Sequence, residues 1–264
     1  MSGAFVLGTY TLAQRELVRF FRQRNRVSGA LLQPIIFWVL FGAGLNASFR
    51  PARGGDDYMV YFFPGILVMI LLFTAIFATV SVIEDRREGF LQSVLVAPVP
   101  RGAMVLGKLL GGTALAVLQG LVFMLLGLTQ GIGYSAATFG AVLGAMLLLA
   151  FALTGLGFIF AWRMESTQGF HAIITVLLLP MWLLSGAFFP ADGTHPVLYA
   201  VMQLNPLTYG TALMRHAMYL DPARTAAPGV PGPALALGVS AGFALLTFAL
   251  SYRIAGTRVA GDLQ

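Results

Sequence analysis

The sequence predicts an all-α integral membrane protein, from its composition, its uncharged stretches and its arginine distribution. Of the 264 residues, 58% are hydrophobic and only 10% are charged, whereas soluble globular chains are about half apolar and a quarter charged. Most of the surface therefore has to face lipid or another apolar partner, which argues against a soluble enzyme. Cysteine is absent, so disulfides, Cys-ligated zinc, iron–sulfur clusters and thiol catalysis are excluded.

Residues 1–27 are expected to form a cytoplasmic amphipathic helix along the membrane surface. Arg15, Arg19 and Arg22 recur at helical spacing, while Leu17 and Phe20 lie on a different face. This two-sided pattern is typical of an interfacial helix. A basic tail beside the first span is the alternative.

Residues 28–253 are predicted to form a single six-helix transmembrane domain, followed by a cytoplasmic tail at 254–264. A bilayer core about 30 Å thick requires about 20 apolar residues of helix. The stretches without Asp, Glu, Lys or Arg that reach this length are 27–49, 58–83, 109–162, 166–191 and 225–252. The third is long enough for two spans, because the Gly-Ile-Gly-Tyr-Ser sequence at 131–135 can turn between them. The span count therefore becomes six.

The arginines predict the topology, because positive charge in short loops stays in the cytoplasm. With the N-terminus inside, only Arg50, Arg53, Arg215 and Arg224 of the sixteen basic residues lie outside. Both termini are therefore expected in the cytoplasm. The four aromatic residues within 58–63 then form an aromatic belt at the outer end of the second span. The net charge of +6 is a modest excess for such a chain and predicts no nucleic-acid partner.

Residues 102–108 match the start of a phosphate-binding P-loop, with the sequence Gly-Ala-Met-Val-Leu-Gly-Lys. The next residue is Leu109, where that site needs a Ser or Thr hydroxyl for magnesium. We therefore interpret the segment as a loop glycine followed by Lys108, a lysine that snorkels at the start of the third span.

Few residues suit catalysis or ion coupling. The histidines are His171, His195 and His216, with no two at i, i+4 spacing, and neither H-E-x-x-H nor G-x-S-x-G occurs. Ion-coupled carriers use ionisable residues inside their spans, and the predicted spans contain none apart from His171. We expect polar histidines without a metal or catalytic role.

Closely spaced glycines predict tight helix packing. Packing within one subunit is the preferred interpretation, and a dimer contact is the alternative. The pairs are Gly107 and Gly111, Gly140 and Gly144, and Gly155 and Gly157.

The longest hydrophilic stretch, residues 84–101, is predicted to lie on the cytoplasmic side between spans 2 and 3. It begins with charged residues, continues as a short apolar helix from Phe90 to Val96, and stops at Pro98 and Pro100. Such a helix is presented at the membrane surface and can dock into a cytoplasmic partner. A solvated loop whose charges only enforce the topology is the alternative.

Residues 183–215 are apolar, yet Pro190, Pro196 and Pro206 argue against one straight span. Short re-entrant helices between spans 5 and 6 fit this pattern, provided that their free backbone groups are buried in protein. An ordinary extracellular loop is the alternative.

Two segments carry a family resemblance. The first reads Glu88-Gly-Phe-Leu-Gln, followed by Leu-Val-Ala-Pro98 and by Gly107-Lys108. The second reads Leu-Ser-Gly-Ala-Phe-Phe-Pro190 and then Leu-Asn-Pro-Leu-Thr-Tyr209. Over essentially its whole length, the chain resembles the permease subunits of type-2 ABC exporters, a family of drug, lipo-oligosaccharide and polysaccharide exporters. Phe90 stands where Thr is common in that family.

The resemblance implies a half-transporter that forms a homodimer and recruits two copies of a separate cytosolic ATPase. ATP and magnesium would bind to that subunit, and this chain would bind no cofactor and catalyse no reaction itself. Residues 84–101 would contain the coupling helix, with its first charges paired across the subunit boundary and Phe90, Leu91 and Leu95 as apolar anchors. The implied ATPase-coupling residues are Glu84, Arg86, Arg87, Glu88, Gly89, Phe90, Leu91, Gln92, Leu95, Pro98 and Arg101.

The resemblance also implies that residues 183–209 shape an extracellular exit. The implied gate residues are Gly186, Phe188, Phe189, Pro190, Asn205, Pro206 and Tyr209.

We therefore expect the permease of an ATP-driven exporter in a bacterial cell (inner) membrane, in contact with membrane lipids. It would move an amphipathic, lipid-like or lipid-linked molecule outward. The alternative is a non-transport membrane anchor or regulator that holds a cytosolic partner. An intramembrane enzyme is disfavoured, because the sequence offers no nucleophile–base or metal-binding set.

Overall fold

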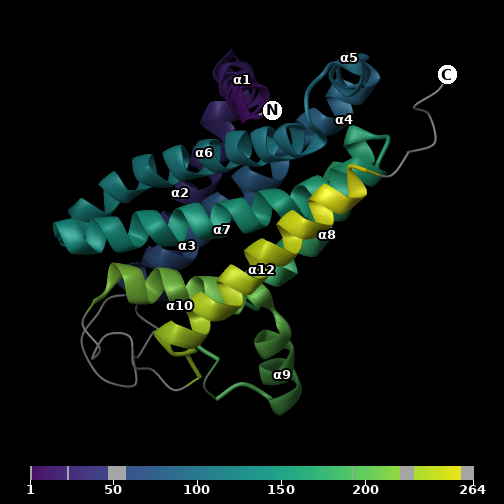
Figure 1. The fold of residues 1–264 in the computed structure, drawn as a ribbon. Coiled ribbons are helices and arrows are strands. Elements are labelled where there is room, and N and C mark those ends of the chain that lie inside the picture. Colours follow the sequence, from purple (N-terminus) through teal and green to yellow (C-terminus); the bar gives the residue numbers. More distant parts are fainter. Residues whose placement is uncertain (1, 23, 47–57, 192, 221–228, 257–264) are drawn as a thin grey trace.

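The computed structural model describes residues 2–22, 24–46, 58–191, 193–220 and 229–256. In these ranges the regular structure is entirely helical, as predicted (Figure 1). A short 3-10 turn, η1 (Leu128–Gln130), follows α6. The α-helices are α1 (Ser2–Arg22), α2 (Arg24–Asn46), α3 (Tyr58–Ala78), α4 (Val80–Arg87), α5 (Phe90–Val96), α6 (Arg101–Gly127), α7 (Ala136–Arg163), α8 (Thr167–Leu183), α9 (Pro196–Leu204), α10 (Pro206–Met218) and α12 (Pro233–Ile254).

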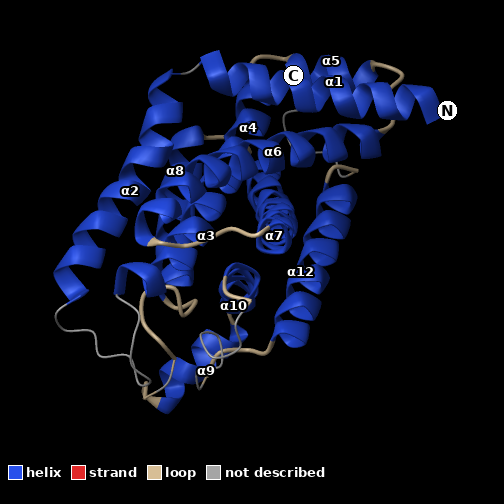
Figure 2. Cartoon of the chain, turned by 90° about the vertical axis from the view of Figure 1, so that its left-hand side faces the viewer, coloured by secondary structure: helices blue, strands red, loops and turns tan. Residues whose placement is uncertain are grey.

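The centre of the molecule is α3, a helix that is apolar on nearly all sides and therefore has to be buried. Helices α2, α6, α7 and α10 contact it, and side chains such as Phe62, Ile66 and Ile70 have no exposed surface. Helices α6 and α7 form a hairpin, and α12 contacts both α7 and α10 (Figures 1 and 2).

Helix α8 is attached to this core by one narrow stripe. Its buried side chains are Phe170, Ile174, Leu178 and Trp182, which recur every fourth residue and so lie on one face. Side chains on the rest of the helix, such as Val176, are exposed. This apolar surface is available to lipid or to another subunit.

Four helices within the described ranges are long and apolar enough to cross a membrane. Tyr58–Arg87, Arg101–Gln130, Ala136–Arg163 and Pro233–Ile254 stand at the predicted positions of spans 2, 3, 4 and 6. The shorter apolar helices Leu32–Leu45 and Thr167–Leu183 stand at those of spans 1 and 5. The all-helical membrane architecture is confirmed, and the count of six stays a prediction.

Both ends of the described chain lie at one end of the molecule. Gly102, in the first turn of α6, lies between Phe5 of α1 and Tyr252 of α12. Arg101 also donates a hydrogen bond to the Gly256 carbonyl at 3.3 Å. An even number of crossings requires this arrangement. We call this the α1 end; α9 and α10 lie toward the opposite, α9 end (Figure 2).

The predicted turn between α6 and α7 is present. Gly131 follows η1 with φ = +70°, a left-handed conformation that favours glycine. Ser135 then caps α7 by accepting a hydrogen bond from the Thr138 backbone N–H at 3.1 Å. The long uncharged stretch therefore folds back as a hairpin.

Glycines in α6 seat α1 against it, as the preferred interpretation predicts. A Cβ atom on Gly107 would lie 2.8 Å from Leu12 Cβ, and one on Gly111 would lie 2.7 Å from Glu16 Cβ. Both distances are too short for a real side chain, so the close approach of the two helices requires glycine at these positions.

The other two glycine pairs differ from each other. Gly155 lies against Thr247 of α12 and Gly157 against Thr79, both within the chain. Around Gly140 and Gly144, by contrast, no described atom lies within 4 Å of the place where a Cβ would stand. At this pair the dimer-contact alternative stays open.

Candidate functional site

Residues 84–101 fold into the surface helix that the sequence predicts. Helix α4 continues α3 after an irregular step at Thr79 and ends at Arg87. Gly89 then adopts φ = +76°, and α5 follows with the predicted bounds of Phe90–Val96. Helix α5 stands at the α1 end of the molecule (Figure 1).

A set of buried charges joins this segment to α1. Asp85 in α4 has no exposed surface. Its carboxylate accepts hydrogen bonds from Arg15 Nη1 at 2.9 Å and Nη2 at 2.8 Å, and from Arg19 Nη1 at 2.8 Å. The two parallel bonds from Arg15 are the strong, bidentate form of this contact.

Lys108 joins the same charges from α6. Its side chain is only 5% exposed, and its Nζ donates to Asp85, to Glu16 Oε1 at 2.5 Å and to Ser81 Oγ at 3.3 Å. The expectation of a snorkelling lysine after a loop glycine is therefore wrong, because α6 already begins at Arg101 and α1 covers its first turns. We call these residues the buried ion cluster: Arg15, Glu16, Arg19, Asp85 and Lys108.

Burial of these charges is costly, and mutual pairing offsets the cost. Taking an ion out of water costs several kcal/mol, which only close pairing and further hydrogen bonds can repay. Burial lowers the pKa of Arg15, but the hydrogen bond to Asp85 and the negative charges of Asp85, Glu16 and Glu88 outweigh this, and the net direction is upward. Arg15 therefore stays charged, and α1, α4 and α6 are fixed to one another at this point.

The first charges of the segment are also engaged within the chain. Arg19 Nη2 lies 2.8 Å from Glu84 Oε2 and 3.4 Å from Glu88 Oε1. Arg86 donates hydrogen bonds to two carbonyl oxygens at the end of α7, at 2.6 and 3.2 Å. Glu84, Arg86 and Glu88 thus have partners within this chain, and pairing of the charges at 84–88 across a subunit boundary stays a prediction. Arg87 and Glu88 keep exposed side chains.

Helix α5 buries one side and exposes the other. Leu91, expected to anchor a partner, is instead buried in the core of this chain. Phe90 is half-buried, and the Arg15 guanidinium carbon lies 3.6 Å from the centroid of its ring. Gln92 and Val96 are exposed, so a partner would contact that side of the helix.

The remaining predicted coupling residues frame this surface. Pro98 and Arg101 are exposed, and Arg101 links the start of α6 to the end of α12 as described above. Leu95 belongs to α5, but its side chain lies outside the described part of the structure.

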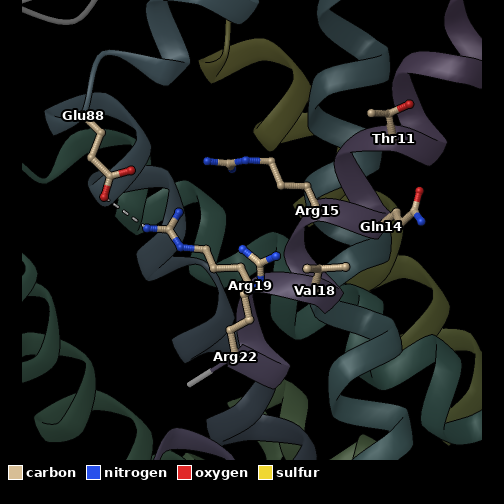
Figure 3. A pocket seen from close by; sticks show the side chains of 7 residues that line it. All are labelled: Thr11, Gln14, Arg15, Val18, Arg19, Arg22 and Glu88. Carbon is tan, nitrogen blue, oxygen red and sulfur yellow. Dashed lines mark hydrogen bonds and ion pairs between the residues drawn. The ribbon is translucent and has the colours of Figure 1, made fainter. Parts of the chain in front are cut away.

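A cavity of about 600 Å³ opens between α1 and the turn after α4. Arg15 and Arg19 extend into it from α1, and an ion pair joins Arg19 to Glu88 across it (Figure 3). The lining residues are Thr11, Gln14, Arg15, Val18, Arg19, Arg22 and Glu88. The cavity therefore lies between α1 and the turn that leads into α5.

At the α9 end, the segment after α8 is hydrogen-bonded to α3. Tyr58 donates to the Phe188 carbonyl at 2.8 Å, and Tyr61 donates to the Gly186 carbonyl at 3.3 Å. Phe189 and Pro190, which follow, are half-buried. Two of the predicted gate residues are thus placed directly against the central helix.

The aromatic residues that begin α3 do not form a belt toward lipid. Tyr58 is 2% exposed, and Phe62 and Phe63 have no exposed surface. The ring of Phe62 packs on that of Phe188, with centroids 5.6 Å apart. The expected belt is wrong because the folded-back segment packs on Phe62, while Trp38 of α2 and Phe123 of α6 pack on Phe63.

The joint between α9 and α10 is built by Asn205 and Pro206. Asn205 accepts a hydrogen bond from the Leu207 backbone N–H at 3.0 Å and donates to the Met181 carbonyl at 2.6 Å. Pro206 occupies the first position of α10, where its missing N–H costs nothing. Tyr209 donates back to the Gln203 carbonyl at 3.0 Å. The predicted short helices are confirmed, whereas their re-entrant depth stays a prediction.

The P-loop resemblance and the histidines have structural explanations. Residues 102–108 are helical, and Lys108 is occupied by carboxylates. His195 accepts a hydrogen bond from Val197 N–H at the start of α9, and His216 contacts the Pro231 carbonyl at 2.9 Å. Within the described residues, no group of three His, Cys, Asp or Glu could hold a metal ion.

The long apolar helices give this chain the fold of a helical membrane protein. Residues 8–219 match the ABC-2 type transporter family, and the chain belongs to that family. It is therefore a transport component, and permeases of this family work with a cytosolic ATPase subunit.

Individual relatives agree with this assignment. The chain is 30% identical over 233 residues to nodulation protein J of Sinorhizobium fredii, covering 85% of this chain and 83% of that one. It is 29% identical over 210 residues to a transport permease, ycf38, of Cyanophora paradoxa, covering 78% and 72%. It is also 25% identical to the ycf38 permease of Porphyra purpurea, and the match covers 78% of this chain and 72% of that one.

Sequence reasoning missed the centre of the site. It gave no role to Glu16, Asp85 or Ser81 and treated Lys108 as a surface residue. One signal was available: Lys108 is the only lysine in the chain, and Glu16 is the only acidic residue among the first fifty. Isolated charges of opposite sign in apolar surroundings indicate a buried pair.

Proposed function

We propose that this chain is the permease subunit of an ATP-driven exporter, acting as a homodimer with two copies of a cytosolic ATPase. The observation that carries the proposal is the buried ion cluster, because it fixes α4, the helix that leads into the surface helix α5, to both α1 and α6. A loop that only separates two spans does not need buried ion pairs. A helix that transmits force to its neighbours needs a rigid connection to them, and the buried ion cluster provides one.

In this proposal the ATPase binds the exposed side of α5 and displaces it when ATP closes the ATPase dimer. Asp85 holds α4 to α1 and to Lys108 of α6. Because packed elements move as units rather than deforming continuously, α1, α4 and the first turns of α6 shift together. Helix α4 continues α3, so the shift reaches the central helix and, through Tyr58 and Tyr61, the segment at the α9 end.

We further propose that the substrate is an amphipathic, lipid-like or lipid-linked molecule that moves outward. The faces that a second copy can meet are apolar, with Ile173, Val176 and Leu179 exposed on α8. The open Gly140 and Gly144 of α7 provide a close-packing site for another helix. A path between two such copies would suit a hydrophobic molecule.

The proposed topology has six spans in a bacterial inner membrane with both termini in the cytoplasm. It is supported by the arginine distribution and by the two chain ends at one end of the molecule. The α1 end then faces the ATPase, and residues 183–209 shape the extracellular exit.

Purification of the chain from intact membranes tests the partner directly. A soluble ATPase is expected to co-purify in equal amounts, and its hydrolysis in liposomes is expected to rise with the transported molecule. Reproducible recovery of the chain alone would overturn the partner assignment. A stable complex without substrate-stimulated hydrolysis or transport would instead favour a membrane anchor.

A further inference from the structure

Arg215, near the C-terminal end of α10, is a buried cation that pairs with no carboxylate among the described residues. It is 6% exposed. Its Nη2 donates one long hydrogen bond to the Gly186 carbonyl at 3.3 Å, and its guanidinium carbon lies 4.3 Å from the ring centroid of Tyr61. Its Nε is buried and has no hydrogen-bond partner in the described part of the chain.

Lys108, the other buried cation among the described residues, shows how a structural charge is satisfied. Lys108 has both Asp85 and Glu16 within ion-pair distance, whereas Arg215 has a ring face and one carbonyl. A cation–π contact and a single neutral acceptor offset only part of the cost of burying a guanidinium. Unpaired cations of this kind in membrane proteins mark functional sites.

Arg215 also stands where a transported molecule would leave. It contacts Gly186, which belongs to the proposed exit, and Tyr61 of α3, whose hydroxyl donates a hydrogen bond to the Gly186 carbonyl. Phe188, two residues beyond Gly186, is half-buried and packs on Phe41 of α2 with ring centroids 5.1 Å apart. The Arg215 guanidinium therefore contacts the same short segment of the exit that carries the apolar ring of Phe188.

We propose that Arg215 binds the phosphate headgroup of an anionic amphiphile, and that this ligand supplies the counter-ion that the described residues do not. The planar guanidinium matches two phosphate oxygens at once, and the bound headgroup would replace the long contact to Gly186. This inference rests on the proposed function, since it names the class of molecule that the exporter moves.

A purely structural clamp is the competing role for Arg215. A clamp holds Gly186 and Tyr61 together whether or not a ligand is bound. Its loss would therefore weaken the binding of all amphiphiles to the same extent. A phosphate site predicts a change in headgroup preference. The ratio of affinities for a charged and an uncharged amphiphile separates the two roles.

The test uses the purified full chain in detergent, with binding followed by native mass spectrometry. The probes are hexadecyl phosphate and hexadecyl maltoside, which share an alkyl chain. Wild type is expected to prefer the phosphate. Arg215→Met is expected to reduce that preference by roughly 10- to 100-fold, the usual effect of losing a hydrogen bond to a charged group. Arg253→Met, a control at the exposed inner end of α12, should keep it.

Arg215→Gln serves as a second variant, because its amide can still donate to Gly186 while carrying no charge. It keeps the test decisive if Arg215→Met does not fold. An unchanged phosphate preference in either folded variant, or no preference in wild type, overturns the inference.

Outward transport in liposomes with the ATPase is measured separately. If export persists although the protein shows no preference for the phosphate headgroup, the phosphate-binding role of Arg215 is wrong and the exporter proposal stands. If phosphate binding depends on Arg215 but the chain recruits no ATPase, the phosphate site is supported and the exporter proposal is wrong.

Discussion

One ammonium group, that of Lys108, connects three helices. Its partners Glu16 and Asp85 come from α1 and α4, and all three side chains are almost completely buried. Removal of Lys108 would leave two neighbouring carboxylates with only the arginines of α1 to balance them. The penalty for an uncompensated buried charge far exceeds the value of a surface ion pair.

Lys108→Met is therefore expected to destabilise the protein by about 3–5 kcal/mol, the usual cost of removing one partner of a buried pair. Thermal unfolding of the purified chain in detergent measures this as a lower melting temperature. Arg163→Met removes an exposed cation at the end of α7 and should have little effect. Equal melting temperatures for the two variants would show that the cluster is not structural.

Gly89 allows a second test, because Gly131 has nearly the same backbone conformation. Their φ angles are +76° and +70°, and neither has a described atom within 4 Å of a would-be Cβ. Each change to alanine should cost about 1–2 kcal/mol of strain. Only Gly89→Ala should also lower the amount of co-purified ATPase, since it reorients α5. Equal ATPase recovery from both variants would argue against α5 as the docking helix.

At the scale of elements, short-range patterns predicted most helices correctly. Basic and apolar residues at helical spacing predicted α1, the glycine-rich turn predicted the α6–α7 hairpin, and the proline stops predicted the end of α5. Each of these patterns depends on neighbours in sequence. The buried ion cluster depends on residues far apart: Lys108 meets Glu16 across 92 positions. No local pattern contains that contact, so Lys108 was misplaced at the surface.

The same reason explains the aromatic residues at the start of α3. Their composition fits a membrane interface, yet the segment after α8 packs on Phe62 and accepts the hydroxyl hydrogen bonds of both tyrosines. Predicting this required knowledge of which distant segment returns to α3. The family resemblance placed that segment at an exit but gave no contacts for it.

Close packing of α1 on α6 leads to a prediction about Gly107. A leucine there would clash with Leu12 and push α1 away, since a Cβ alone would lie 2.8 Å from Leu12 Cβ. Gly107→Leu should therefore expose Arg15 and Arg19 to trypsin and speed cleavage in α1. Gly140→Leu, in an open position of α7, should leave that cleavage slow. Equal digestion rates would show that α1 is not held by this contact.

Across the whole molecule, rigid contacts connect the α1 end to the α9 end. Helix α5 and the buried ion cluster stand at the α1 end, α3 passes through the core, and hydrogen bonds from Tyr58 and Tyr61 hold the segment at the α9 end. A displacement of α5 is therefore expected to be transmitted to the α9 end. This transmission requires the ATPase to contact the exposed side of α5.

That contact can be tested with single cysteines, because the chain has none of its own. Val96→Cys places a thiol on α5 at a residue that is 86% exposed, and Val197→Cys places one on α9, 67% exposed, at the other end. Cross-linking in isolated membranes with a thiol-reactive photo-cross-linker is expected to join the ATPase to the chain through position 96 and not through position 197. Absence of an ATPase adduct at position 96, in membranes where the two proteins co-purify, would contradict the account.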